Sequence, residues 1–191
     1  IHIDIVDEEG WQERLRIVGQ PLKSLLFDEL QVEARSINET GGTVESDFRQ
    51  FSDLLQEIRE QRKSAIAFAP RGIGLSKLSG DSKYQTHLRR PYMLLGATLA
   101  STQVWDVLRC FEEIRSLDGH DQPPVHVRAD REMTEVAAFA TLFSKPISSL
   151  TLKISPRDDV EAPDFLNWSR LITPKQLRSL VERSTQLHIQ P

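Results

Sequence analysis

The chain contains one cysteine in 191 residues, so it can form neither an internal disulfide nor a thiolate-rich zinc site. It also lacks a surplus of positive charge, because 24 Lys and Arg stand against 28 Asp and Glu. The formal net charge of −4 argues against a general nucleic-acid binder. No apolar run approaches the roughly 18 residues that a membrane-spanning helix needs. These deficits leave a soluble protein without nucleic-acid or membrane partners, and they name no activity.

The beginning of the chain lacks both a visible signal peptide and an initiating methionine. No basic and apolar leader typical of a signal peptide is visible, so no targeting segment indicates a compartment. The chain starts at Ile1 and not at methionine, which favours a processed chain or a piece of a longer protein, for instance its C-terminal domain. Other domains of that parent protein would then be its partners. The length fits one domain, which we expect to span residues 1–191, with 1–42 the least clear part.

Short apolar or alternating segments predict strands, and apolar residues at helical spacing predict helices between them. Strands are expected at residues 1–6, 64–69, 125–127, 150–154 and 187–189. Helices are expected around residues 48–58, 104–114 and 132–143, and from Thr173-Pro174 onward. This alternation predicts an α/β fold, a mostly parallel sheet with helices on both faces. Functional loops should follow the carboxyl ends of the strands, at 70–90, 128–132 and 155–167.

Several segments have a more particular interpretation. The acidic stretch 4–9 is expected to form a solvated turn, and residues 11–37 combine helical and strand signals. The uncharged run 64–69 predicts a strand covered on both faces. Residues 71–90, rich in Gly, Ser and basic side chains, are expected to form a loop, and Thr43 or Ser46 could cap the helix after Gly41-Gly42.

Four short segments carry a family resemblance. They are Ala67-Phe-Ala-Pro-Arg-Gly-Ile-Gly74, Arg89-Arg90, Leu94-Leu-Gly96 and Val104-Trp-Asp-Val-Leu-Arg109. Together they resemble α/β-hydrolases of the acetyl xylan esterase and dienelactone hydrolase type, over roughly residues 43 to 190. The resemblance implies a reduced α/β-hydrolase-like fold and, in an active member, hydrolysis of carboxylic esters. Such chemistry needs a nucleophile at a sharp strand-to-helix turn, usually within Gly-x-Ser-x-Gly, with an acid and a histidine later in the chain.

The decisive turn departs from the family pattern. The expected turn, Arg128-Ala-Asp-Arg-Glu132, contains no serine, and no Gly-x-Ser-x-Gly occurs in the chain. The one late histidine, His188, lies inside an expected strand. We therefore expect a catalytically degenerate domain that serves as a structural, binding or assembly unit. The alternative is an active ester hydrolase with a non-serine nucleophile, or one completed by another chain, so the sequence leaves open whether the protein is an enzyme.

Asp130 is the candidate catalytic residue, because it occupies the expected turn and some α/β-hydrolases use an aspartate nucleophile there. Its simpler interpretation is a cap on the helix that follows. Arg71, Gly72 and Arg90 are the candidate ligand-binding residues, because Arg71, Arg89 and Arg90, with His87 and Lys83 nearby, could form an anion-binding corner at the strand ends. In the structural interpretation, Arg71 instead bonds loop carbonyls and Arg90 is solvated.

The remaining reactive side chains have structural interpretations. His126 alternates with two valines and is expected to be packed or hydrogen-bonded. Cys110 lies in the middle of a predicted helix, without the N-terminal position that activates thiols. No pair of histidines has the spacing of metal ligands, so the sequence predicts no metal and no cofactor.

Overall fold

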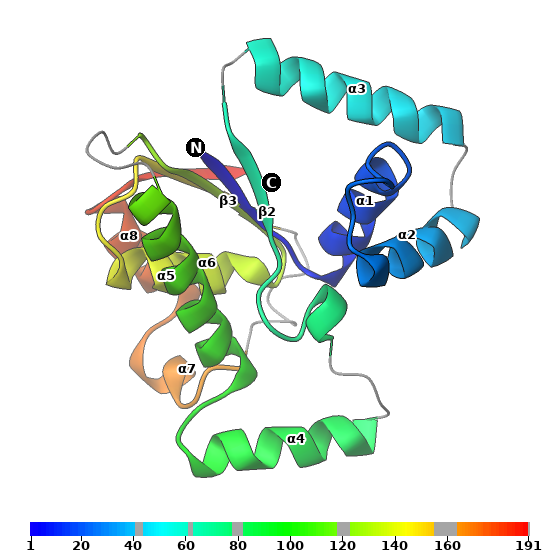
Figure 1. Ribbon diagram of the computed structural model, residues 1–191. Helices are drawn as coiled ribbons and strands as arrows, with labels where there is room; N and C mark the ends of the chain where they lie inside the picture. The colour runs from blue at the N-terminus through cyan, green and yellow to red at the C-terminus, as the bar shows by residue number, and fades with distance from the viewer. Residues whose placement is uncertain (41–43, 61–62, 78–81, 118–122, 155–163, 191) are drawn as a thin grey trace.

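The computed structural model describes residues 1–40, 44–60, 63–77, 82–117, 123–154 and 164–190. Five parallel strands form one sheet in the order β2-β1-β3-β4-β5 (Figure 1), which confirms the predicted α/β fold class. The strands are β1 (His2–Ile5), β2 (Ala65–Phe68), β3 (His126–Asp130), β4 (Ser149–Lys153) and β5 (Gln186–Gln190). The helices are α1 (Glu8–Gly19), α2 (Asp28–Thr40), α3 (Val44–Glu60), α4 (Ser82–Leu94), α5 (Leu99–Leu117), α6 (Met133–Phe143), α7 (Trp168–Leu171) and α8 (Pro174–Glu182), with the short 3-10 helix η1 (Gly74–Ser76).

The strand order explains where the helices lie. The chain moves from β1 to β2 in one direction across the sheet, and then from β2 to β3, β4 and β5 in the other. Because crossovers between parallel strands are right-handed, the two directions place their helices on opposite faces. Figure 1 shows this arrangement, with α1, α2 and α3 on one side of the sheet and α5, α6 and α8 on the other.

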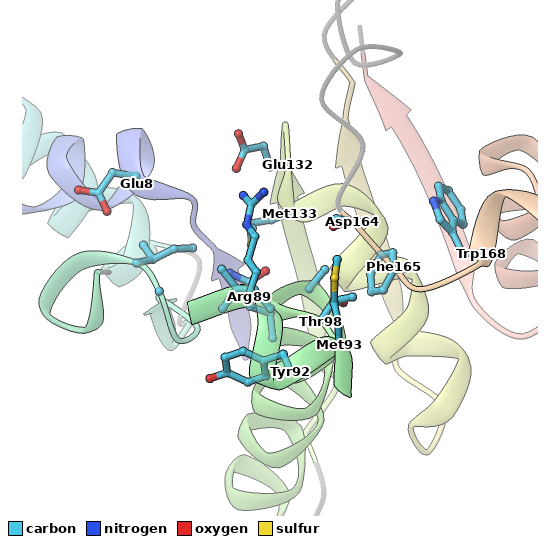
Figure 2. Close-up of a pocket in the computed structure, with 15 residues that line it drawn as sticks. Glu8, Arg89, Tyr92, Met93, Thr98, Glu132, Met133, Asp164, Phe165 and Trp168 are labelled. Carbon is cyan, nitrogen blue, oxygen red and sulfur yellow. The ribbon is translucent and has the colours of Figure 1, made fainter. Parts of the chain in front are cut away.

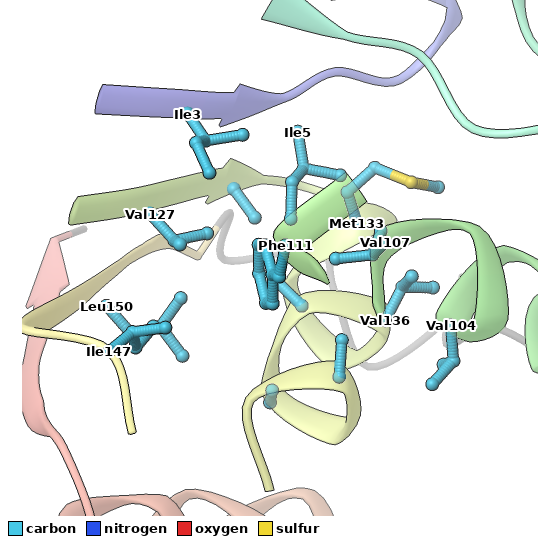
Figure 3. Close-up of a cluster of buried hydrophobic side chains, with 14 of the residues drawn as sticks. Ile3, Ile5, Val104, Val107, Phe111, Val127, Met133, Val136, Ile147 and Leu150 are labelled. Atoms are coloured by element: carbon cyan, nitrogen blue, oxygen red, sulfur yellow. The ribbon is translucent and has the colours of Figure 1, made fainter. Parts of the chain in front are cut away.

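The hydrophobic core lies between the sheet and α5, α6 and α8 (Figure 3). Inward-facing strand residues such as Ile3, Val127 and Leu150 are neighbours in the parallel register and are nearly or completely buried. Phe111 of α5 and Val136 of α6 close the core from the helix side. Each such side chain contributes about 1.5–3 kcal/mol when removed from water, so this face supplies most of the apolar stabilisation.

The opposite face of the sheet is polar where it extends beyond α1 and α3. His126 and Ser149 are half-buried there, whereas Arg128, His188 and Gln190 are exposed. A parallel sheet is normally apolar on both faces because helices cover both. In this chain the connection from β1 to β2 is the one that supplies helices to the second face. Among the described residues, the part of that face formed by β3, β4 and β5 is therefore left uncovered.

The N-terminal region differs from the sequence prediction. Residues 4–9 are not a solvated turn: Asp7 is buried and caps α1, accepting a hydrogen bond of 2.8 Å from the Gly10 amide. Glu8 and Glu9 then occupy the first turn of α1, where carboxylates interact favourably with the helix dipole. The ambiguous segment 11–37 lies mostly in α1 and α2.

Two other local predictions were wrong, and one of the two candidate caps of α3 is excluded. The strand over 64–69 is not covered on both faces, because β2 is an edge strand with Ala65 and Ala67 exposed. The segment 71–90 is not a simple loop, since it contains η1 and most of α4. Ser46 lies inside α3 and does not cap it, and Thr43 lies outside the described residues.

The described helices include none that combines the length and the apolar character required to cross a bilayer.

Candidate functional site

A cavity of small-molecule size lies at the carboxyl edge of the sheet. Its volume is about 740 Å³. The strand order reverses at β1 and β3, so the segments that follow these two strands diverge to opposite faces and leave a crevice between them. Glu8, Gly72 and Met133 line the cavity from the segments after β1, β2 and β3. Figure 2 shows the remaining wall, which comes from α4, the start of α5 and the segment before α7.

The turn between β3 and α6 contains the strained residue of this edge. Arg131 has a φ of +49°, in the left-handed region that a branched-chain or bulky residue seldom adopts. A sharp strand-to-helix turn of this kind is where an α/β-hydrolase places its nucleophile. The strained position is therefore Arg131, one residue later than Asp130, which the sequence analysis placed there.

Arg131 is held by an ion pair across the reversal point of the sheet. Its Nε and Nη2 donate to the two carboxylate oxygens of Asp7 at 2.5 and 2.7 Å. Burial alone would raise the pKa of Asp7, but the hydrogen bonds from Arg131 and from the Gly10 amide outweigh it and lower that pKa. The same hydrogen bond to Asp7 raises the pKa of Arg131. The turn between β3 and α6 thus carries a cation engaged with a buried carboxylate.

Asp130, the candidate catalytic residue, is paired with Arg128 at the end of β3, and its catalytic role stays a prediction. Its carboxylate accepts hydrogen bonds of 3.2 and 3.1 Å from Nε and Nη2 of Arg128. The N-cap of α6 is Glu132, with no capping hydrogen bond from its side chain, so the capping interpretation was wrong. Asp130 is not among the described residues that line the cavity, and no described histidine hydrogen-bonds to it.

Arg71 is committed to the fold. Its Nε donates to Asp106 Oδ2 at 2.7 Å, Nη2 bonds the other oxygen, and its amide also donates to Asp106 at 3.0 Å. The hydrogen bond to Asp106 raises the pKa of Arg71, and buried Gln103 donates to the Arg71 carbonyl at 3.0 Å. These contacts fasten the segment after β2 to α5. Gly72, with a φ of +84°, lines the cavity as a predicted ligand-binding residue would.

Arg89, and not Arg90, lines the cavity. Both belong to α4, and Arg90 is exposed outside the cavity lining. Figure 2 shows Arg89 extending from α4 toward the start of α6, where Glu132 and Met133 lie. Within the described part of the chain, the Arg89 side chain has no hydrogen bond or ion pair. The sequence placed both arginines in the predicted anion-binding corner and could not distinguish them, because 71–90 was interpreted as a loop, in which neighbouring arginines are equivalent.

Glu8 fastens the opposite wall of the cavity. Its carboxylate accepts hydrogen bonds from the Gly74 amide at 3.0 Å and from Lys77 Nζ at 2.9 Å. Gly74 has a φ of +57°, and a Cβ there would lie 2.5 Å from the indole of Trp11. Only glycine fits this backbone conformation and this approach. Glu8 is therefore occupied by structural contacts.

Aromatic and apolar side chains form the other end of the cavity. Phe165 and Trp168 pack edge-to-face, with ring centroids 5.9 Å apart, and both contact Phe139 of α6 in the same manner. Met133, which is 2% exposed, lies at the start of α6. Asp164 precedes this cluster, is exposed, and has no described partner. The cavity therefore combines an apolar floor with one cation and one carboxylate that have no side-chain partner among the described residues.

The histidines and the cysteine lie elsewhere. His126 Nδ1 is 2.7 Å from Ser149 Oγ at the amino ends of β3 and β4, so the prediction of a hydrogen-bonded histidine is confirmed. His188 is exposed on β5, and Cys110 is half-buried in α5. Burial raises the pKa of Cys110 to about 11. No group of three His, Cys, Asp or Glu residues in the described ranges is arranged to hold a metal ion.

Fold and site together define an α/β protein with a doubly wound parallel sheet and a cavity at the point where its strand order reverses. Comparison of the chain with protein-family models, with curated proteins and with solved structures finds no match.

Proposed function

We propose that the chain is a catalytically degenerate α/β-hydrolase-like domain that binds a neutral, hydroxyl-rich ligand, of the carbohydrate class, in the cavity at the carboxyl edge of its sheet. The observation that carries this proposal is the ion pair between Arg131 and Asp7. It fills the strained strand-to-helix position with a side chain that cannot act as a nucleophile, beside a cavity of about 740 Å³.

The cavity supports binding without hydrolysis. No Ser, Cys or His is among the described residues that line it. Thr98, whose aliphatic hydroxyl most resembles that of serine, accepts a hydrogen bond from the Ser101 amide at the start of α5. Acyl transfer needs a nucleophile activated by an adjacent base. Small-molecule ligands commonly bind in clefts of roughly 300–1,000 Å³, so a cavity of this volume suits such a ligand.

The polar groups of the lining favour a ligand with hydroxyl groups. The Arg89 guanidinium offers donors and no acceptor, whereas the Asp164 carboxylate offers acceptors. A hydroxyl group both donates and accepts, so neighbouring hydroxyls of one ligand satisfy both side chains. The rings of Tyr92 and Phe165 supply apolar surface against which the carbon skeleton of a sugar ring can pack.

The test is an isothermal calorimetric titration of the protein with neutral oligosaccharides of xylose, glucose and mannose. At least one should bind saturably, and both Arg89→Gln and Asp164→Asn should weaken that binding by about tenfold, the effect of losing one charge-assisted hydrogen bond. Arg90→Gln, one position away on α4 and outside the lining, is the matched control and should leave the affinity unchanged.

Two results would contradict this proposal. One is the absence of binding across the whole oligosaccharide panel, together with saturable binding of tetramethylammonium or acetate, which would assign the cavity to a charged ligand. The other is turnover of an ester, for which the alternative of an active hydrolase would account.

A further inference from the structure

A second hollow lies on the polar face of the sheet, away from the cavity described above. It has a volume of about 360 Å³ and is bounded by α3 and by the amino-terminal halves of β1, β3 and β4. We call this hollow the polar groove. Its lining includes His2, Lys63, His126, Ser149 and Thr151. None of these five residues lines the larger cavity.

The strand register assembles the centre of the polar groove. His2 lies opposite His126, and His126 lies opposite Ser149 in the parallel ladder. The two imidazoles stack with centroids 4.8 Å apart and planes 20° from parallel. The contact between His126 Nδ1 and Ser149 Oγ, at 2.7 Å, leaves Nε2 of His126 for another partner. Two imidazoles and a hydroxyl are thus held in a row by three neighbouring strands.

The charges around this row are unevenly balanced. Asp4 is paired with Arg14, and Arg128 is paired with Asp130, so these four groups largely neutralise one another. Lys63 has no hydrogen bond or ion pair of its side chain among the described residues. The last charged group of the lining, Glu57 on α3, already has an interaction partner.

We propose that the polar groove binds an oxyanion of the phosphoryl type, with Lys63 as its charged contact and His2, His126 and the hydroxyls of Ser149 and Thr151 as its hydrogen-bonding groups. An ammonium group, two imidazoles and two hydroxyls offer donors to several oxygens of a tetrahedral anion at once. A phosphate group fills only part of 360 Å³. The groove therefore has room for the organic remainder of a small phosphate monoester.

The electrostatics of the histidines support this site. Burial is the main cause that lowers the pKa of both imidazoles, and the positive charge of Lys63 lowers them further. The neighbouring imidazole adds to the effect at His2, and Asp4 partly opposes it. An anion bound beside them would counter these positive charges, so that it raises the pKa of both histidines and binds more tightly as the pH falls.

The experiment is a titration with inorganic phosphate at pH 6.5, in which phosphate replaces chloride at constant ionic strength. NMR spectra monitor binding through the imidazole resonances of His2 and His126. Both should move saturably, and their titration midpoints should rise when phosphate is present. Glucose 6-phosphate should bind more tightly than inorganic phosphate, and glucose should leave the two resonances unchanged. Equal affinities for the two phosphates would mean that free phosphate is the ligand of the site.

The variant Lys63→Gln should weaken phosphate binding by about tenfold or more. Lys153→Gln, on the same face but outside the lining, should leave it within about twofold. If Lys63→Gln fails to fold, as judged by circular dichroism, His126→Gln replaces it with the same expected loss. Non-saturating shifts, or binding that survives both variants and is lost in Arg89→Gln, would overturn the proposal.

Discussion

The ion pair between Arg131 and Asp7 makes a strong prediction about stability. Asp7 is 7% exposed, and its carboxylate accepts two hydrogen bonds from Arg131 and one from the Gly10 amide. Breaking a buried ion pair commonly costs about 3–5 kcal/mol, because one charge stays buried without its partner. The Arg131 side chain is 39% exposed, so water reaches part of this site and reduces the cost. We expect Arg131→Ala to lower the free energy of unfolding by about 2–3 kcal/mol at pH 7.

The loss should depend on pH in a defined direction. The folded-state pKa of Asp7 lies below its usual value of 3.8, so the carboxylate stabilises the fold when it is ionised. This contribution is complete above about pH 5 and disappears as the pH falls through the folded-state pKa. The stability difference between the wild type and Arg131→Ala should therefore be constant from pH 7 to pH 5 and should shrink below pH 3.8.

Urea denaturation followed by far-ultraviolet circular dichroism measures this difference. Arg128→Ala is the matched control, because its pair with Asp130 is more exposed, and it should cost less than about 1 kcal/mol. A loss in Arg131→Ala no greater than in Arg128→Ala, or a difference that grows on acidification, would refute the assignment of Asp7 as the ionised partner.

Two further experiments test the packing of the fold, one at the turn around Gly74 and one at Cys110 in α5. Gly74→Ala should lower the free energy of unfolding by more than about 2 kcal/mol, because it combines left-handed backbone strain with a clash against Trp11. Gly96 also has a positive φ, +72°, but a Cβ there would meet no atom within 4 Å, so Gly96→Ala should cost about 1–2 kcal/mol from strain alone. Equal losses in urea denaturation would show that the Trp11 contact does not constrain this turn. Iodoacetamide should alkylate Cys110 at pH 8 on the order of a hundredfold more slowly than free cysteine, because burial raises its pKa to about 11. Alkylation at the rate of free cysteine, measured by mass spectrometry, would contradict the buried position of this thiol.

The sequence was a good guide to the central strands and to the helices that cover them. Residues such as Val127 and Leu150 alternate with polar neighbours, and α5 and α6 carry apolar residues at helical spacing, so local periodicity was sufficient. The capping box of α8, with Thr173 and Gln176, was likewise readable because its partners are three residues apart.

Features that depend on distant parts of the chain were not readable. The edge position of β2 follows from the strand order, and its short apolar run is typical of a central strand as well. Asp7 was assigned to a solvated turn because its partner Arg131 lies 124 residues away. The distinction between Arg89 and Arg90 depends on the phase of α4, and the continuous stretch without glycine from 82 to 95 was the available signal for that helix.

The left-handed backbone of Arg131 had no local signal at all. Arginine carries no preference for positive φ, and such strain persists only where the surroundings impose it. In this chain the ion pair with Asp7 and the packing at the start of α6 impose it. The predicted turn was therefore located correctly between β3 and α6, while the residue at its strained position was shifted by one.

In the proposed function, Arg131 closes the position of the nucleophile, so that the domain binds its ligand without hydrolysing it. The most direct test is the steady-state hydrolysis of 4-nitrophenyl acetate by the purified chain, compared with Arg131→Ala, with Asp130→Asn and with buffer. We predict saturable turnover in none of them, and rates for all three proteins that equal the buffer rate after correction for non-specific reaction with surface groups. Saturable turnover by the wild type that Arg131→Ala or Asp130→Asn abolishes would contradict the account, because it would place a catalytic group at the turn between β3 and α6.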